Sequence, residues 1–341
     1  MGRAGAFGPA LALVAAVMAA GPGKAQMLRF SDLAGWENDD HAAALATFRE
    51  TCDLLDGPDW SALCSLAADV TDARRFFELF FRPVRIGDDP ALFTGYYEPE
   101  LRGSLTPDHR YAHPVFRPPP ELDPGDIWHT RQEIEENGLL RGRGLEIAWL
   151  EDPVEAFFLQ IQGSGRIRLP DGGTIRLGYA AKNNRPYRSI GAELVRRGIY
   201  APHQVSAQVI RSWVRRNPAE GRALLHHNPS FVFFRVLPDL PAHRGPVGAM
   251  GRSVTAGRSI AVDPAFHPLG APVWIEKDGA APMHRLMIAQ DVGGAITGAQ
   301  RADIFYGTGH DAGEAAGRIR DRGRLVTLLP IELAYALLDE G

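Results

Sequence analysis

Two aspartates in the C-terminal part of the chain, Asp291 and Asp303, are its clearest candidates for acid–base chemistry. Asp303 lies in the apolar segment ADIFYG (302–307), where an ionised carboxylate is costly to bury, so its pKa should rise. A raised pKa keeps a proton available near neutral pH, as a general acid requires. Asp291 ends RLMIAQD (285–291) and either faces the same cleft or caps the following turn. The alternative for Asp303 is a satisfied polar residue in a turn.

A second set of polar and aromatic side chains has the chemistry that binds sugars. Amides can hydrogen-bond to neighbouring hydroxyls, and aromatic rings can stack on pyranose rings. Gln160 and Gln162 alternate with apolar residues within 156–169, which predicts one strand that lines a groove. Any one of these residues could instead be an ordinary exposed polar group. The set comprises Tyr96, Tyr97, Gln160, Gln162, Tyr179, Lys182, Asn183, Asn184 and Tyr187.

Metal, nucleotide and serine-nucleophile chemistry have little support in the sequence. It contains no HExxH motif, no CxxC pair and no histidines four residues apart on a predicted helix, so we expect no metal and no cofactor. Gly307, Gly309 and Gly313 follow the dinucleotide fingerprint only loosely, and too few residues remain after them to complete a nucleotide-binding half-domain. Ser164 lies between two glycines, but in a predicted strand-to-strand context, where we expect a glycine bulge.

The bulk composition indicates a β-rich globular protein. The 341 residues suffice for one large domain or two ordinary ones, and the 37 glycines and 26 prolines suit turn-rich β structure. A formal net charge of −4 gives no basis for binding that depends on neutralising phosphates. We therefore expect no nucleic-acid partner.

The first 26 residues have the features of an export signal. Arg3 supplies the positive charge, residues 9–20 form the apolar stretch, and Gly23 and Ala25 fit the small positions before a cleavage site. The apolar stretch is shorter than the roughly 20 residues that a membrane span needs, although an uncleaved anchor is the alternative. No cysteine follows it, so a lipid-anchored N-terminus is not expected by this route.

Cys52 and Cys64 are the only cysteines in the chain. In an exported protein they could form a disulfide across a small loop. The alternative is a pair of buried thiols on packed helices, since Leu45, Phe48 and Cys52 follow helical spacing. Neither cysteine has a histidine nearby in sequence, so cysteine catalysis is not expected.

The elements that must position these residues are helical at first and then mixed. A helix capped by Asp39 or Asp40 should end at Gly57, and a second helical stretch should end in 71–81. A strand is predicted at 93–101, and the proline-rich passage 114–126 is typical of an ordered surface connection. The segments 156–169 and 173–180 are predicted to form a hairpin.

The second half of the chain is predicted to contain two helices and then mostly strands. The helices are expected at 190–197 and 205–216, the latter with Val205, Val209 and Trp213 on one stripe. The short strands that follow, with glycine and proline turns and one helix at 313–320, suggest a small mixed barrel. These strands are 258–263, 272–276, 285–291, 302–307 and 324–330.

Seven segments, in order across about residues 90 to 330, resemble the lytic murein transglycosylase A family. They are FTGYYEPEL, FFLQIQGSGRI, GYAAKNNRPYRSIG, NPSFVFF, TAGRSIAVDP, HPLGAPVWIE and DVGGAITGAQRADIFYGTGHDAGEAAGR. The resemblance implies a mainly β fold with helices: a double-psi β-barrel domain, a smaller inserted β domain and a groove between them. Residues 27–99 and 241–335 would build the barrel domain and 100–240 the inserted one, after the export signal at 1–26.

The resemblance also implies an activity and its site. The family cleaves the β-1,4 bond between N-acetylmuramic acid and N-acetylglucosamine in peptidoglycan, leaves a 1,6-anhydromuramic product and uses no metal. Its catalytic aspartate carries over to Asp303, and a supporting aspartate carries over to Asp291. The segments that line the family's groove suggest substrate contacts at Thr94, Tyr97, Gln160, Gln162, Ser164, Lys182 and Asn183.

One carboxyl group is enough for this chemistry, whereas ordinary glycosidases use two. Asp303 would protonate the leaving oxygen, and its carboxylate would then take the proton of the sugar's own C6 hydroxyl as the ring closes. Intramolecular attack of this kind reaches effective molarities on the order of 10⁵ M. The alternatives are a cell-wall glycan-binding protein without activity and an inverting glycoside hydrolase.

The expected setting of such an enzyme is the cell envelope. Family members are often lipid-anchored in the outer membrane, yet this chain lacks the cysteine for that anchor. We therefore expect a soluble, monomeric periplasmic enzyme with at most a weak association with the envelope. Its partner would be the glycan strand of peptidoglycan.

Overall fold

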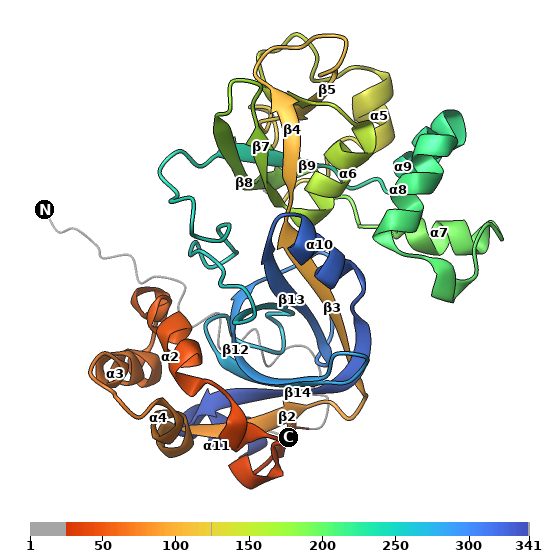
Figure 1. Ribbon diagram of the computed structural model, residues 1–341. Coiled ribbons are helices and arrows are strands. Elements are labelled where there is room, and N and C mark those ends of the chain that lie inside the picture. The colour runs from red at the N-terminus through yellow and green to blue at the C-terminus, as the bar shows by residue number, and fades with distance from the viewer. Residues whose placement is uncertain (1–24, 124, 340–341) are drawn as a thin grey trace, which may run out of the picture. The chain divides into compact units, whose positions relative to one another are not determined.

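The computed structural model describes residues 25–123 and 125–339, and the chain divides into two compact units (Figure 1). Unit 1 comprises the residues up to 95, residues 247–305 and those from 319 onward, and unit 2 comprises residues 96–246 and 306–318. The predicted export signal lies outside the described residues except for Ala25 and Gln26, which open strand β1 (Ala25–Met27).

Unit 1 is built on a mixed sheet of eight strands. Strand β10 runs parallel to β12 and antiparallel to β13. Strand β3 pairs with β14 as well as with β13, so the pairings from β14 through β11, β12, β10, β13 and β3 return to β14. In pairing order the strands are β1, β2 (Phe81–Ile86), β14 (Arg320–Pro330), β11 (Pro272–Lys277), β12 (Met283–Asp291), β10 (Ser259–Val262), β13 (Arg301–Thr308) and β3 (Ala91–Glu98).

These strands confirm the predicted mixed β class and the five strands expected after residue 257. The double-psi connectivity stays a prediction. The centre of the sheet is buried because β11 contributes the fully covered Val273, Trp274 and Ile275. The helix predicted at 313–320 is α10 (His310–Gly317), which begins three residues earlier and ends before Arg320, where β14 starts.

Three short helices pack an aromatic core against the sheet of unit 1: α2 (His41–Arg49), α3 (Pro58–Ala67) and α4 (Ala73–Phe80). The buried ring of Phe48 lies 6.1–6.5 Å from the rings of Trp60, Phe76, Phe77 and Phe81, measured between centroids. Truncating one such ring to alanine typically costs about 3–5 kcal/mol. A further helix, α11 (Ile331–Asp339), packs on β1 and β2.

The first long helix begins as predicted but ends early. Asp40 caps α2 by accepting a hydrogen bond of 3.0 Å from the backbone of Ala43. The predicted end at Gly57 is wrong, because the Thr51 hydroxyl donates to the Phe48 carbonyl at 2.7 Å and the chain turns into the 3-10 helix η3 (Cys52–Leu54). Other single 3-10 turns are η1 (Phe30–Asp32), η2 (Trp36–Asn38) and η4 (Pro202–Gln204).

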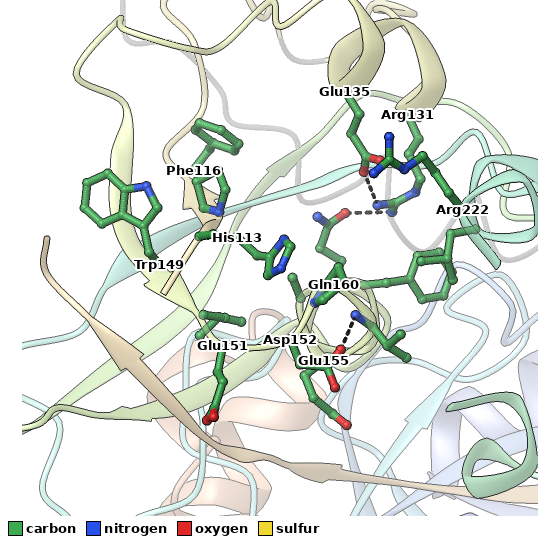
Figure 2. Close-up of a pocket in the computed structure, with 18 of the residues that line it drawn as sticks. His113, Phe116, Arg131, Glu135, Trp149, Glu151, Asp152, Glu155, Gln160 and Arg222 are labelled. Atoms are coloured by element: carbon green, nitrogen blue, oxygen red, sulfur yellow. Dashed lines mark hydrogen bonds and ion pairs between the residues drawn. The ribbon is translucent and has the colours of Figure 1, made fainter. Parts of the chain in front are cut away.

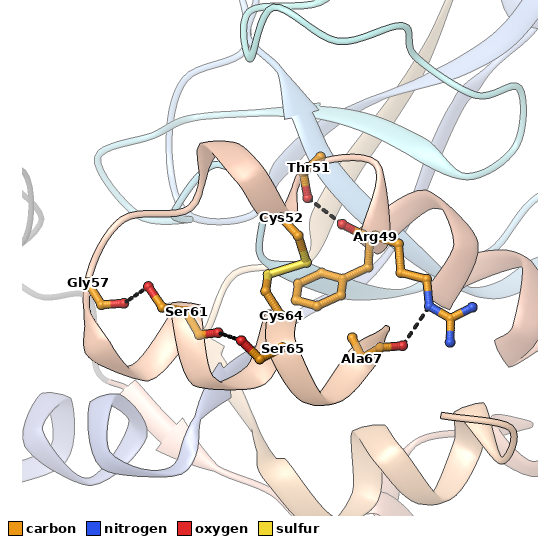
Figure 3. The surroundings of a disulfide bond; sticks show 9 residues. Arg49, Thr51, Cys52, Gly57, Ser61, Cys64, Ser65 and Ala67 are labelled. Carbon is orange, nitrogen blue, oxygen red and sulfur yellow. Dashed lines mark hydrogen bonds between the residues drawn. A yellow bond between two sulfur atoms is a disulfide. The ribbon is translucent and has the colours of Figure 1, made fainter. Parts of the chain in front are cut away.

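A disulfide joins Cys52 in η3 to Cys64 in α3 (Figure 3). Of the two alternatives that the sequence leaves open, the structure therefore has the bonded pair. Beside the bond, the Arg49 side chain donates from Nε to the Ala67 carbonyl at 2.6 Å, so the ends of α2 and α3 are held together twice. A bond that closes a loop of this size stabilises a fold by about 3 kcal/mol in the chain-entropy model.

Unit 2 has a six-stranded sheet with helices packed on it. The predicted hairpin is present as β7 and β8, and Gly172 with its φ of +88° allows the tight turn between them. The proline-rich passage 114–126 contributes its first residues to β5. In pairing order the strands are β5 (His113–Phe116), β6 (Glu146–Leu150), β4 (Glu100–Ser104), β7 (Ser164–Arg168), β8 (Thr174–Lys182) and β9 (Val232–Val236).

The strand predicted at 156–169 is wrong for its first half, which forms helix α6 (Pro153–Gln162). The Asp152 side chain accepts from the backbone of Val154 at 2.8 Å, Pro153 occupies the first turn, and Gly163 ends the helix with a φ of +74°. These are strong helix-boundary features, and they outweigh the apparent two-residue alternation. Ser164 consequently follows a helix, which corrects the predicted strand-to-strand context.

Four other helices complete unit 2 together with α10: α5 (Arg131–Glu136), α7 (Ile190–Arg196), α8 (Ala207–Arg216) and α9 (Pro218–His227). Two of them, α7 and α8, were predicted. The stripe expected on α8 is shifted, since Ile210 and Val214 are its buried residues. The side chain of Thr130 caps the start of α5 and that of Ser206 caps α8, whereas Pro218 occupies the first turn of α9.

Candidate active site

The sheet of unit 1 places Asp291 and Asp303 on one face. Strand β10 lies between β12 and β13, and its residue Ala261 pairs with Asp291 on one side and with Asp303 on the other. Residues directly opposite each other on neighbouring strands point to the same face of a sheet. Two strand spacings of about 4.8 Å put the two aspartate Cα atoms about 10 Å apart. Ala261, the residue between them in the sheet, is 3% exposed.

A short hydrogen-bond chain leads to the Asp303 carboxyl group. The Thr94 hydroxyl, on β3, donates to Oδ1 of Asp303 at 2.6 Å. The Arg301 guanidinium in turn donates to the Thr94 hydroxyl oxygen at 2.8 Å and to the Leu92 carbonyl at 3.2 Å. Because Thr94 accepts from Arg301, its single hydroxyl proton is directed to Asp303.

Burial raises the pKa of Asp303 to about 6, as the apolar surroundings in the sequence predict. The hydrogen bond from Thr94 and the charge of Arg301 lower this pKa, whereas the charge of Asp291 raises it further. Desolvation of the charged form is the largest of these effects. Near pH 6 about half of the molecules therefore keep the proton on Asp303, and this is the range in which a carboxylic acid can act as a general acid.

Asp291 takes one of the two positions that its sequence left open, in the turn after its strand, and a shared cleft with Asp303 stays a prediction. Its Oδ1 accepts hydrogen bonds of 2.9 Å from the backbone of Ala249 and of Val292, so it holds the turn after β12. Its charge also acts on the pKa of Asp303, so the two carboxyl groups share one electrostatic environment. Asp291 is fixed by backbone donors and suited to an electrostatic role.

Arg301 is a site residue that the sequence reading missed. It precedes Asp303 by two residues on β13, so both side chains lie on the same face of the strand. Burial is the main cause that lowers the pKa of Arg301, and the charge of Asp303 opposes it. The two-residue spacing was a usable signal, but the partner Thr94 lies 207 residues away in sequence.

Two of the sugar-binding candidates in unit 2, Tyr97 and Gln162, lie together. The Tyr97 backbone donates to the Gln162 side chain at 3.0 Å, and Arg211 donates to the Tyr97 hydroxyl at 3.3 Å. A Cβ at Gly313 would lie 2.6 Å from the Tyr97 ring, so this glycine lets α10 pack directly on that ring. Ser164 is nearly buried at the start of β7, and Lys182 is exposed at the end of β8.

Two further candidates in unit 2, Gln160 and Asn183, have their side-chain oxygens hydrogen-bonded within the fold. The Gln160 side-chain oxygen accepts from Arg131 at 2.8 Å and from the Val232 backbone at 3.1 Å. Asn183 is fully buried, and its amide bonds to the carbonyls of His129 and Pro229 and to the backbone of Phe231. Gln160 and Gln162 also project from α6 about 200° apart. The prediction that they alternate along one strand is therefore wrong.

Among the residues that the structure describes, no group of three or more His, Cys, Asp and Glu side chains is arranged to hold a metal ion.

Comparisons with known proteins match both parts of the chain. Residues 92–235 match the family model described as the MltA specific insert domain, and residues 258–329 match that of the 3D domain. The membrane-bound lytic murein transglycosylase A of Vibrio cholerae is 36% identical over 264 residues, which cover 73% of this chain and 69% of the relative.

Solved structures are similar over almost the whole chain. The membrane-bound lytic murein transglycosylase of Agrobacterium tumefaciens has a TM-score of 0.79 and 35% identity over 92% of this chain and 99% of its own. Escherichia coli MltA, solved with bound chitohexaose, has a TM-score of 0.73 and 29% identity over 90% of this chain and 94% of its own.

Proposed function

Because the chain belongs to the lytic murein transglycosylase A family, we propose that it is a peptidoglycan lytic transglycosylase that uses Asp303 as its acid. It cleaves the β-1,4 bond between N-acetylmuramic acid and N-acetylglucosamine without water and leaves 1,6-anhydromuramic ends. The observation that carries the proposal is the position of Asp303, whose pKa burial raises to about 6 beside a directed hydroxyl donor.

The reaction begins with the proton on Asp303. Because Oδ1 accepts the Thr94 hydroxyl, the acidic proton sits on Oδ2 and passes from there to the bridging oxygen of the glycan. The bond from this oxygen to C1 of the muramic acid breaks, and an oxocarbenium-like state forms. The C6 hydroxyl of the same sugar then bonds to C1, and the Asp303 carboxylate takes its proton. The carboxyl group ends as it began, and no water is consumed.

Thr94 and Arg301 act at the intermediate stage of the reaction, when Asp303 is a carboxylate. When Asp303 has given up its proton, the Thr94 hydroxyl donates to the new carboxylate over a short distance. Arg301 fixes that hydroxyl and places a positive charge nearby. Thr94 is thus proposed to position the acid, rather than to bind substrate as its segment first suggested.

Asp291 is proposed to support the acid through its charge. A negative charge close to Asp303 favours the protonated acid at the start of the reaction and favours positive charge on the sugar in the transition state. The backbone bonds from Ala249 and Val292 keep it in place. It transfers no proton in this scheme, so its role is weaker than that of Asp303.

Tyr97, Gln162, Ser164 and Lys182 are proposed as glycan contacts in unit 2. The Tyr97 ring and the Gln162 amide are already held by neighbours, which lowers the entropy lost on binding. Gln160 and Asn183 are proposed to order the chain around the contacts, because their amide groups bond to backbone and to Arg131.

The proposed location is the periplasm, reached through an export signal at residues 1–26. The relatives carry the name membrane-bound. None of the helices that the structure describes has the length and apolar character needed to cross a membrane. The partner is the glycan strand of peptidoglycan, and the enzyme is proposed to act as a monomer.

Digestion of purified sacculi followed by mass spectrometry of the released products tests the proposed function. Wild type should release 1,6-anhydro-muropeptides, and Asp303→Asn should release none although it stays folded, with a melting temperature no lower than that of wild type. Products with reducing ends would identify a hydrolase instead. Binding to sacculi with no released product from wild type would identify a glycan-binding protein.

A further inference from the structure

Unit 2 contains a large cavity, and none of the residues around Asp303 belongs to its lining. Its volume is about 1090 Å³, just above the roughly 300–1,000 Å³ typical of ligand pockets. The lining comes from β4, β5, α5, β6, α6, α8 and α9, together with the loops beside them, and all of it lies within unit 2. Figure 2 shows His113, Phe116 and Trp149 on one side of the cavity and Arg131, Glu135 and Arg222 on the other.

One wall of the cavity is built around Arg131, whose guanidinium donates four hydrogen bonds. The side chain of Arg131 is 2% exposed, and its guanidinium donates to Glu135 at 3.1 Å and to Gln160 at 2.8 Å (Figure 2). It also donates to the Ser230 carbonyl at 2.7 Å and lies over the ring of Phe157, 4.6 Å from its centroid. These contacts fix the orientations of Arg131, Glu135 and Gln160 in the wall of the cavity.

The orientation of Gln160 leaves one donor available. Its oxygen accepts two hydrogen bonds, from Arg131 and from the backbone of Val232. The amide nitrogen points away from Arg131, and it has no hydrogen-bond partner among the residues that the structure describes. Gln160 therefore offers a fixed N–H₂ group to a ligand in the cavity.

Only three of the charged side chains in the lining, histidines aside, have no ion pair within the described part of the chain: Arg141, Glu146 and Arg222. Most of the other carboxylates are paired with arginines, for example Asp152 with Arg215 at 2.7 Å and Glu135 with Arg131, and Glu136 lies 3.5 Å from His226. Two available cations and one available carboxylate suit a ligand that carries carboxylates and an ammonium group. A polyanion is disfavoured because it would also face the paired carboxylates.

His113 lies among these groups and gives the cavity a neutral donor or acceptor. Burial is the main cause that lowers its pKa, and the charge of Arg222 lowers it further, whereas Asp152 and Glu135 raise it. The imidazole is therefore uncharged at neutral pH.

We propose that this cavity is a second binding site, which takes the peptide stem that peptidoglycan carries on its muramic acid residues. Arg222 and Arg141 bind its carboxylates, the Gln160 amide donates to it, Glu146 meets its ammonium group, and the Trp149 side covers its apolar part. The proposal rests on the proposed function for the substrate class, but the cavity itself does not depend on the chemistry at Asp303.

Isothermal titration of the full chain with a free stem peptide tests this site. The probe is the tetrapeptide L-Ala-γ-D-Glu-meso-diaminopimelate-D-Ala, acetylated at its amino end so that it matches the linked stem. Arg222→Gln and Arg141→Gln should each weaken its binding by about tenfold or more, since each removes a hydrogen bond to a charged group. Gln160→Glu keeps the oxygen that Arg131 and Val232 need and replaces the free donor, so it should also weaken binding.

The matched control is Arg235→Gln, which removes an exposed arginine of unit 2 outside the cavity and should change binding by less than about twofold. The proposal is overturned if wild type binds no peptide, if Arg222→Gln binds it as well as wild type does, or if the control loses as much affinity. It is also overturned if Arg222→Gln weakens binding of chitohexaose in place of the peptide. Peptide binding without anhydro products from sacculi would reject the proposed function alone, and digestion without peptide binding would reject this site alone.

Discussion

Thr94→Val should move the pH dependence of the enzyme toward alkaline pH while it lowers the maximal rate. Wild type loses activity as pH rises through the Asp303 pKa of about 6, because only the protonated acid can start the reaction. The Thr94 hydrogen bond of 2.6 Å stabilises the carboxylate form and so holds this pKa down. A hydrogen bond to a charged group is worth about 1.5–3 kcal/mol, and 1.36 kcal/mol corresponds to one pH unit. Allowing for water that replaces the hydroxyl, the alkaline limb should move up by about one pH unit.

The same variant should lower the rate at pH 5 by about tenfold, since the carboxylate left after proton transfer loses a donor. The assay is the initial rate of anhydro-muropeptide release between pH 4.5 and 8.5, with sacculi below saturation and at constant ionic strength. Thr94→Ser keeps the hydroxyl, so the alkaline limb of its pH–rate profile and its maximal rate should both match those of wild type. If the limb of Thr94→Val stays at the wild-type pH or moves to lower pH, the hydrogen bond does not set the pKa of the acid. A purely structural role would lower the rate without moving the limb.

Three further outcomes are expected. Asp291→Asn removes a charge that raises the pKa of Asp303, so activity should fall less than in Asp303→Asn and its alkaline limb should move to lower pH; complete loss of activity here, with Asp303→Asn still active, would exchange the two roles. Asp303→Asn should stabilise the fold by as much as about 3 kcal/mol above pH 6, because the stability of wild type falls as pH rises from 3.8 through the folded pKa of about 6. That gain should vanish below pH 4, and melting curves at pH 8 and pH 3.5 that show equal differences would contradict it. The Cys52→Ser/Cys64→Ser double variant should lose about 2–4 kcal/mol, and wild type should melt at the same temperature as the variant only in the presence of reductant; no effect of reductant would contradict a stabilising bond.

The strands of the site could be predicted from the sequence, because their residue types are compatible with few secondary structures other than a short buried strand. Segments such as 285–291 and 302–307 combine apolar residues with glycine boundaries, and both form strands at the predicted positions. The raised pKa of Asp303 follows from the same pattern, since the neighbours of this carboxyl group on β13 are buried. Local composition was enough to predict both results.

Helix α6 shows where local patterns conflict. Its residues Phe157, Leu159 and Ile161 alternate as in a strand, whereas Val154, Phe157 and Phe158 follow the spacing of a helix. In the structure the latter three are buried together with Leu159, and Ile161 is exposed. The Asp152–Pro153 start and the Gly163 end decide the outcome. Giving these boundary residues more weight would have predicted the helix.

Other parts of the site depend on contacts between distant segments, which no single sequence reveals. Arg301 becomes a site residue only because β3 brings Thr94 beside it. Asn183 looked like a sugar ligand because its amide is polar, but loop backbone from residues 129, 229 and 231 uses that amide. The cavity of unit 2 was not predicted for the same reason, because its walls come from helices and strands spread over residues 100–231.

Carbon-13 NMR of the full chain, labelled at the aspartate carboxyl carbons, measures the central property directly. The Asp303 signal is identified by its absence from Asp303→Asn, and its shift is followed from pH 3 to pH 9. We expect a titration midpoint near 6, far above that of an exposed aspartate. A midpoint at or below the ordinary value near 3.9 would show that this carboxyl group is already charged when the glycan arrives, and that it has no proton to give.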